Sequence, residues 1–106
     1  MSKKEEQTKE TLQHLAGEFL AREAGRQSLI TITRSEISPD LKKITIFISV
    51  YPESAEKAAL DFCKRERSGF REFVKDKSSL QFPPTIDFEL DIGEKNRQRI
   101  DELTKK

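Results

Sequence analysis

The sequence predicts a small α+β domain with two layers, in which helices cover one face of a β-sheet. Apolar residues first recur with helical spacing, up to Ala24. They then alternate with polar residues in separate stretches that end at Val50 and Ile92, as in strands with one buried face. The chain has 106 residues, enough for one hydrophobic core. We therefore expect a single domain over residues 1–106, with its core at about 11–92.

The N-terminal segment has the features of an amphipathic helix. Ser2-Lys3-Lys4-Glu5 fits a capping box, in which side chains satisfy the free amides of a helix start. The apolar residues that follow fall on one face: Leu12, Leu15, Ala16, Phe19, Leu20 and Ala24. Gly25 comes next and can adopt the left-handed conformation that closes a helix. We therefore expect this helix to end at Gly25.

Two strands joined by a turn come after this helix. Residues 29–37 are rich in β-branched side chains, and Ile30 and Ile32 alternate with threonines. Ser38-Pro39-Asp40 has the composition of a turn. The second strand alternates without a break, and its buried face is predicted to hold Ile44, Ile46, Ile48 and Val50.

Helical spacing returns after Pro52, which has no amide proton for a sheet and so ends the second strand. The second helix is expected to begin near Glu53. Gly69 interrupts its apolar pattern, and we interpret this glycine as a kink between two helices. A positive φ would make alanine unfavourable at Gly69, whereas in a straight helix alanine would be preferred by about 1 kcal/mol.

A third strand follows Pro83-Pro84, which exclude helix continuation. Its buried face is predicted to hold Ile86, Phe88, Leu90 and Ile92. The acidic residues between them, Asp87, Glu89 and Asp91, are expected on a solvated face. Ile100 and Leu103 permit a short C-terminal helix. The predicted order of elements is therefore helix, strand, strand, kinked helix pair and strand. This is the order of a type II KH domain.

Catalysis has no support in this sequence. His14 is the single histidine and lies off the apolar face of the first helix, and the lone Cys63 falls on a buried helix face. The acidic residues of the third strand lie in a row that does not converge on a metal, and no glycine-rich phosphate loop occurs. No apolar run is long enough to span a membrane. We expect a cytoplasmic non-enzyme with no cofactor, small-molecule substrate or membrane partner.

The placement of basic charge is more informative than its total. Lysine and arginine number 20 against 19 acidic residues, so the net charge of +1 does not indicate a nucleic-acid partner. Four basic residues nevertheless recur three or four apart and predict one stripe for phosphate contacts: Lys64, Arg67, Arg71 and Lys75. An ordinary solvated helix face is the alternative.

Two further groups of residues are candidates for the same RNA-binding surface. Ser68 and Gly69 would lie at the start of the second helix of the pair, where backbone amides favour an anion. Lys42 and Lys43 in the predicted hairpin, together with Arg34, are weaker candidates.

Three stretches of the chain resemble the ribosome-binding factor A family. Residues 32–49 resemble its strand-loop-strand signature, in which an apolar residue, Ser, any residue, Asp and Leu lead into an alternating strand. Ser68-Gly69-Phe70-Arg71 resembles its helix-kink-helix segment, and residues 84–91 resemble its third strand. The family's kink is usually Ala-x-Gly, but Arg67 stands at the alanine position here. The family's Arg-rich N-terminal segment is also missing.

The resemblance implies a type II KH fold and a function in ribosome assembly. The chain would bind the rRNA of the small (30S) ribosomal subunit late in subunit maturation, as a monomer and without catalytic residues. The alternative is a protein-interaction module that uses the acidic face of the third strand, or the apolar groove beside it, and has negligible RNA affinity. A small enzyme on the same scaffold is the least supported reading.

Overall fold

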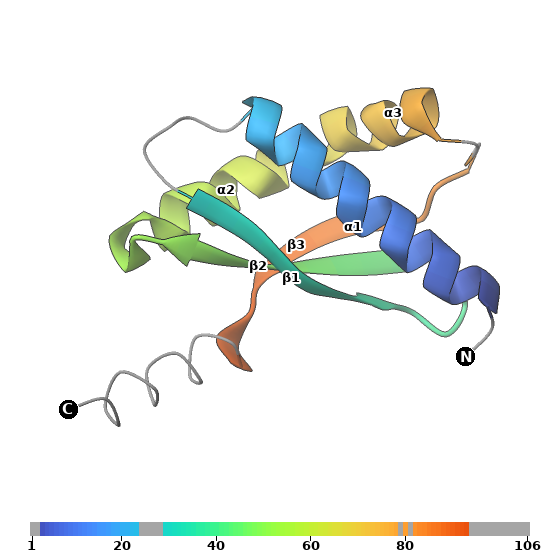
Figure 1. Ribbon diagram of the computed structural model, residues 1–106, viewed down its shortest axis with the longest axis horizontal. Coiled ribbons are helices and arrows are strands. Elements are labelled where there is room, and N and C mark those ends of the chain that lie inside the picture. The colour runs from blue at the N-terminus through green and yellow to red at the C-terminus, as the bar shows by residue number, and fades with distance from the viewer. Residues whose placement is uncertain (1–2, 24–28, 79, 81, 94–106) are drawn as a thin grey trace.

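The computed structural model describes residues 3–23, 29–78, 80 and 82–93. Its elements are, in order, α1 (Lys3–Glu23), β1 (Leu29–Ile37), β2 (Lys43–Tyr51), a short 3-10 helix η1 (Glu53–Ala55), α2 (Glu56–Arg65), α3 (Arg67–Lys77) and β3 (Thr85–Leu90) (Figure 1). This order confirms the predicted α+β, KH-like arrangement. The predicted helix stop at Gly25 and the C-terminal helix with Ile100 and Leu103 lie outside the described residues.

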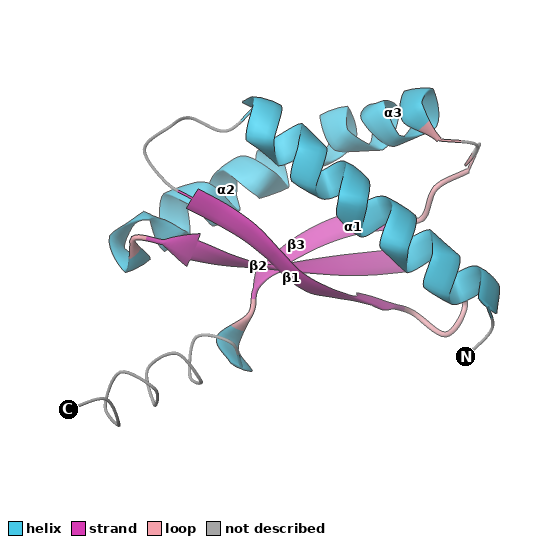
Figure 2. Ribbon diagram, viewed as in Figure 1, coloured by secondary structure: helices cyan, strands magenta, loops and turns pink. Residues whose placement is uncertain are grey.

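The three strands form one sheet in the order β1-β2-β3. β1 and β2 are antiparallel, with Leu29 opposite Tyr51 and Ile37 opposite Ile44. β2 and β3 run parallel, so the chain between them must cross over the sheet, and α2 and α3 form that crossover. Figure 2 shows α1, α2 and α3 on one side of the sheet. The two predicted layers are therefore present.

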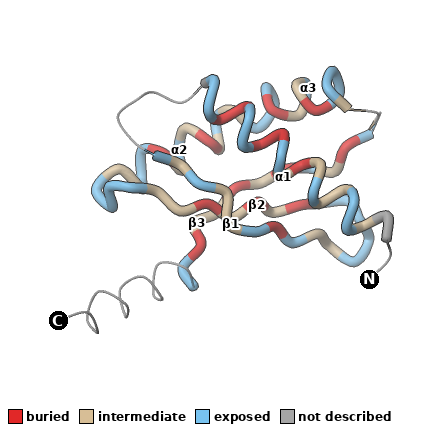
Figure 3. The backbone as a smooth tube through the Cα atoms, viewed as in Figure 1, coloured by how far each residue is buried: buried red, intermediate tan, exposed pale blue. Residues whose placement is uncertain are grey.

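The core lies between the sheet and the helices. Three side chains of the central strand are fully buried, Ile44, Ile46 and Ile48, and the predicted fourth, Val50, is half-buried. Buried residues recur along α1 and α3 (Figure 3) and belong to the same hydrophobic core as the three isoleucines. The ring centroid of Phe19 in α1 lies 5.4 Å from those of both Phe70 and Phe73 in α3. This aromatic contact joins α1 to α3.

A β-bulge in β1 changes which side chains face the helices. The register shifts between Ile32 and Arg34, so one extra residue, Thr33, enters the strand. Ile30 and Ile32 are half-buried before the bulge, and the buried side chain after it is Ser35. The Ser35 hydroxyl donates a 2.7 Å hydrogen bond to Oε1 of Gln13, so the buried polar group is satisfied.

The helix pair is broken, as predicted, but the break is not at Gly69. Glu66 ends α2 and precedes α3 with φ −90° and ψ 8°, three residues earlier. Gly69 does not have a positive φ and lies in the first turn of α3. A Cβ atom at this position would lie 3.7 Å from Cζ of Phe19, an ordinary contact distance. The glycine therefore marks the approach of α3 to α1 and not a turn.

Two expectations for the end of β3 were wrong. β3 ends at Leu90, and Ile92 is 66% exposed and does not belong to the buried row. Asp91 was expected on a solvated face but is buried, with 7% of its surface exposed. Its amide still donates to the carbonyl of Ile48 (2.8 Å), so the backbone pairs with β2 one residue beyond the strand.

Changing Ile46 to Asp is predicted to unfold the domain. Its side chain is fully buried in the central strand, where an unpaired carboxylate has no partner. Lys43→Asp, at an exposed position of the same strand, should change the free energy of unfolding by no more than about 0.5 kcal/mol. Thermal melts followed by circular dichroism check both variants, and a cooperative, wild-type melt of the Ile46 variant would contradict the assigned core.

Gly69→Ala is predicted to stabilise the protein by up to about 1 kcal/mol, because it improves helix propensity without a steric clash. Gly17→Ala in α1 is the matched change, since a Cβ there meets nothing within 4 Å. Both variants should melt at a higher temperature than the wild type. A lower melting temperature for Gly69→Ala alone would mean that α3 cannot accept a methyl group against Phe19.

Candidate nucleic-acid interface

The predicted basic stripe, Lys64, Arg67, Arg71 and Lys75, runs from the end of α2 along α3 and crosses the break at Glu66. Its N-terminal half contacts acidic residues of β3. Nζ of Lys64 lies 3.2 Å from Oδ1 of Asp87 and 2.8 Å from Oε1 of Glu89. Nη1 of Arg67 lies 3.1 Å from the same Asp87 oxygen. The N-terminal half of the stripe is therefore already paired with carboxylates of β3.

The C-terminal half of the stripe has weaker partners. Nη2 of Arg71 donates to the carbonyl of Pro83 (3.2 Å), and the described residues supply no carboxylate to its guanidinium. Lys75 is exposed and lies 3.5 Å from Oε1 of Glu72, one helical turn away on the surface. Such exposed pairs contribute little, so the positive charge of Arg71 and Lys75 is the more available part of the stripe.

The start of α3 holds Ser68 and Gly69 on an exposed surface. No acidic residue occurs in the first turn, and no side chain caps it. However, Oε2 of Glu66 lies 3.4 Å from the position of a Cβ at Gly69. A carboxylate therefore already lies beside this helix start, which reduces its attraction for an anion.

The ion pairs of Asp87 and Lys64 shift the pKa of both groups. The hydrogen bond to Glu89 and the contact with Asp87 raise the pKa of Lys64, although partial burial opposes this. Burial raises the pKa of the Asp87 carboxyl, but the Phe88 amide and Lys64 more than offset it, so this pKa lies below its ordinary value. Both groups therefore remain charged at neutral pH, which keeps the pair intact.

The remaining basic candidates lie in two different places. The exposed Lys42 and Lys43 are at the end of the β1–β2 turn. The Ser38 hydroxyl donates to the Asp40 carboxylate, which also accepts from the amide of Lys42, and the Ser38 hydroxyl oxygen accepts from the amide of Lys43. The carbonyl of Lys42 accepts a bond from the amide of Thr85 (2.8 Å), just after the Pro83 that Arg71 contacts. The turn and Arg71 therefore each contact the entry to β3, two residues apart.

Arg34 lies apart from the stripe, on the sheet face away from the helices. Its guanidinium carbon is 3.8 Å from the ring centroid of Phe47, which alternates with buried residues of β2. The same group pairs with Glu36 and, at 3.3 Å, with the buried Asp91. Asp91 also accepts a 2.6 Å bond from the hydroxyl of Thr33, the bulge residue. Arg34 therefore has a structural role that links β1, β2 and the end of β3.

The groups considered for catalysis do not form a site. His14 is exposed on α1, and burial raises the pKa of the Cys63 thiol to about 11, so it is protonated at neutral pH. Within the described part of the chain, no group of histidine, cysteine and acidic residues is placed to hold a metal ion. No helix in this part is long and apolar enough to cross a membrane.

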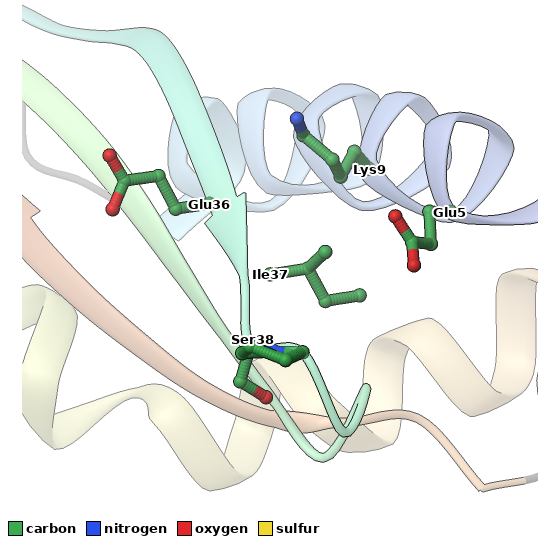
Figure 4. Close-up of a pocket in the computed structure, with 6 residues that line it drawn as sticks. Glu5, Lys9, Glu36, Ile37 and Ser38 are labelled. Carbon is green, nitrogen blue, oxygen red and sulfur yellow. The ribbon is translucent and has the colours of Figure 1, made fainter. Parts of the chain in front are cut away.

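A hollow lies between the N-terminal part of α1 and the end of β1 (Figure 4). Glu5 and Lys9 line it on one side and Glu36, Ile37, Ser38 and Pro39 on the other. Its volume of about 230 Å³ is below the range of roughly 300–1,000 Å³ that small-molecule sites occupy. The hollow does not support an active site.

The sequence patterns did not reveal Asp87 and Glu89 as partners of the stripe. These residues were expected on a solvated strand face, but α2 packs beside the edge strand β3 and Lys64 reaches both carboxylates. One feature of the sequence could have indicated this pairing. Basic residues recur three or four positions apart on the helices, and acidic residues recur two positions apart on the third strand. Their contact depends on the crossover geometry.

Asp87→Asn is predicted to destabilise the protein at neutral pH by no more than about 1 kcal/mol, the range of partly exposed ion pairs. Because its pKa is lowered in the folded state, the contribution of Asp87 is present above the unfolded pKa of about 3.9 and is lost as the pH falls through the folded pKa. The difference between wild type and variant should therefore shrink between about pH 5 and pH 2. Urea unfolding across this range checks it, and a difference that does not depend on pH would contradict the pairing.

Comparison with known proteins gives a consistent result. The family model of ribosome-binding factor A matches residues 3–104. Ribosome-binding factor A of Thermobifida fusca is 31% identical over 90% of this chain and 65% of its own length. The Saccharopolyspora erythraea protein of that name is 29% identical over 74% of this chain and 48% of its own length. The chain thus spans between about half and two thirds of these relatives.

A solved structure supports the fold. The crystal structure of ribosome-binding factor A from Thermus thermophilus superposes with a TM-score of 0.66 and 21% identity, over 79% of this chain and 92% of that one. At this identity the likeness concerns the KH-like fold alone. The family model, by contrast, matches nearly the whole sequence. The chain therefore belongs to the ribosome-binding factor A family.

Proposed function

We propose that this protein binds rRNA of the small (30S) ribosomal subunit late in subunit maturation, in the cytoplasm, as a monomer and without catalysis. The observation that carries the proposal is the basic stripe, which crosses the α2–α3 break along the side of the helix pair next to β3. Membership of the ribosome-binding factor A family supports the choice of partner.

The contacts of the stripe indicate which residues would bind phosphate first. Arg71 offers a planar guanidinium with donors beyond the one that Pro83 accepts. Lys75 is exposed and only loosely paired with Glu72. Lys42 and Lys43 would extend this surface around the entry to β3, because the backbone of Lys42 is bonded to Thr85.

The other predicted RNA-binding residues would contribute less. Lys64 and Arg67 must exchange or share their carboxylate partners before they can bind phosphate. Ser68 and Gly69 share a helix start at which the carboxylate of Glu66 already lies beside Gly69. Arg34 is engaged with Phe47, Glu36 and Asp91 on the far face of the sheet, so we assign it the lowest rank.

A protein-interaction module is the second candidate, and one observation favours it. Leu29 and Tyr51 lie opposite each other at the end of the β1–β2 pair and are 66% and 76% exposed. Exposed apolar pairs of this kind can bind another protein. The acidic face of β3 supports this reading less, because Asp87 and Glu89 are paired internally.

The test is co-sedimentation with purified small ribosomal subunits across a series of salt concentrations. The wild type should sediment with the subunits, and an Arg71→Gln, Lys75→Gln double variant should bind more weakly. Removing two phosphate contacts should flatten the dependence of log affinity on log salt by about 1.4 for single-stranded RNA. Lys75→Gln should lower the free energy of unfolding by no more than about 0.5 kcal/mol. Arg71→Gln has the same limit, to which the loss of the hydrogen bond from Arg71 to the Pro83 carbonyl is added.

Lys57→Gln, Arg65→Gln is the matched control, because it removes the same charge from exposed positions of α2 outside the stripe. This control should retain the wild-type salt dependence. Equal affinity and equal slope for all three proteins would place the binding surface elsewhere. If none of them sediments with the subunits, the protein-interaction reading replaces the proposed function.

A further inference from the structure

The acidic pair of β3, Asp87 and Glu89, occupies donors that the basic stripe would use for phosphate. Nζ of Lys64 has three N–H donors, and two of them point to carboxylates at 3.2 and 2.8 Å. Nε of Arg67 donates to the carbonyl of Lys64 (2.9 Å) and Nη1 to Asp87 (3.1 Å). Four of the eight N–H donors in the N-terminal half of the stripe are therefore already used within the folded protein, three of them by the two carboxylates.

These contacts are close but not sealed from solvent. The side chains of Arg67 and Glu89 are 47% and 46% exposed, whereas that of Asp87 is 19% exposed. Water and solutes can therefore reach Arg67 and Glu89. An incoming anion can approach the same donors without unfolding of the surrounding core.

A carboxylate and a phosphate compete for the same N–H groups. Both present oxygen acceptors to lysine and to the planar fork of arginine, in charge-assisted hydrogen bonds. A phosphate that binds Lys64 or Arg67 must displace Asp87 or Glu89, or share the cation with them. When it displaces them, the freed carboxylate lies close to the RNA and repels it.

We infer that Asp87 and Glu89 are affinity-setting residues, internal competitors that keep Lys64 and Arg67 from contributing fully to RNA binding. The inference rests on the proposed function and concerns the regulation of that same surface. Before RNA binds, the charge that is available for phosphate is that of Arg71 and Lys75. The Lys64–Arg67 half is added only where the RNA outcompetes the acidic pair.

The test compares the wild type with an Asp87→Asn, Glu89→Gln variant, which keeps the shape of both side chains. Binding of single-stranded oligo(U) and of purified small ribosomal subunits is measured across a salt series. The variant should bind oligo(U) roughly fivefold more tightly at low salt, as expected for the release of three partly exposed ion pairs. Its salt slope should become steeper by about 1.4, because two more cations contact phosphates.

Two controls separate this competition from a general change in charge. Glu10→Gln, Glu18→Gln removes the same charge from exposed positions of α1 and should leave the slope unchanged. In a Lys64→Met, Arg67→Met background, neutralising the acidic pair should also leave the slope unchanged. Thermal melts of every variant confirm that the comparison concerns folded protein.

The outcomes distinguish this inference from the proposed function. A steeper slope that requires Lys64 and Arg67 supports the inference. An unchanged slope in the acidic-pair variant, with binding that still depends on Arg71 and Lys75, overturns the inference and leaves the proposed function standing. If neutralising the acidic pair steepens the salt slope equally with and without Lys64 and Arg67, the inference is overturned as well. Absence of binding to both probes by the wild type and by the variant overturns both proposals.

Discussion

Parallel pairing of β2 with β3 is the constraint on which most of this structure depends, because parallel neighbours need a long crossover that returns along one face of the sheet. The crossover here is the pair α2 and α3, and its break at Glu66 lets each helix serve a different contact. α2 lies beside the edge strand β3 and brings Lys64 to Asp87 and Glu89. α3 turns toward α1, where Phe70 meets Phe19.

The same topology determines how charge is distributed. Helices cover one face of the sheet, so the phosphate-binding candidates lie on the helix layer and at the entry to β3. The opposite face has its own network, in which the bulge residue Thr33 and the guanidinium of Arg34 both reach the buried Asp91. A chain with a net charge of +1 can therefore present a local basic surface, while many of its charges are used internally.

Regular periodicity made much of the fold predictable from sequence. Ile44, Ile46 and Ile48 alternate strictly, and all three are buried. The bulge was not predicted, although Ile37 comes five positions after Ile32, an odd interval that a regular strand cannot place on one face. Gly69 indicated the helix break only approximately, because the break lies three residues earlier at Glu66, while Gly69 has no positive φ and lies in the first turn of α3 beside Phe19. The stripe was predictable from spacing, but its carboxylate partners come from a strand about twenty residues away and required the crossover geometry.

Amide hydrogen exchange of the protein, with and without purified small ribosomal subunits, tests the central claim most directly. The claim is that the subunit binds the α2–α3 surface around the basic stripe. It predicts slower exchange over residues 64–75 and around Lys42 and Lys43 in the presence of subunits, with little change at the Leu29 and Tyr51 end of the sheet. Slower exchange at Leu29 and Tyr51, with residues 64–75 unchanged, would contradict the account and assign binding to the sheet.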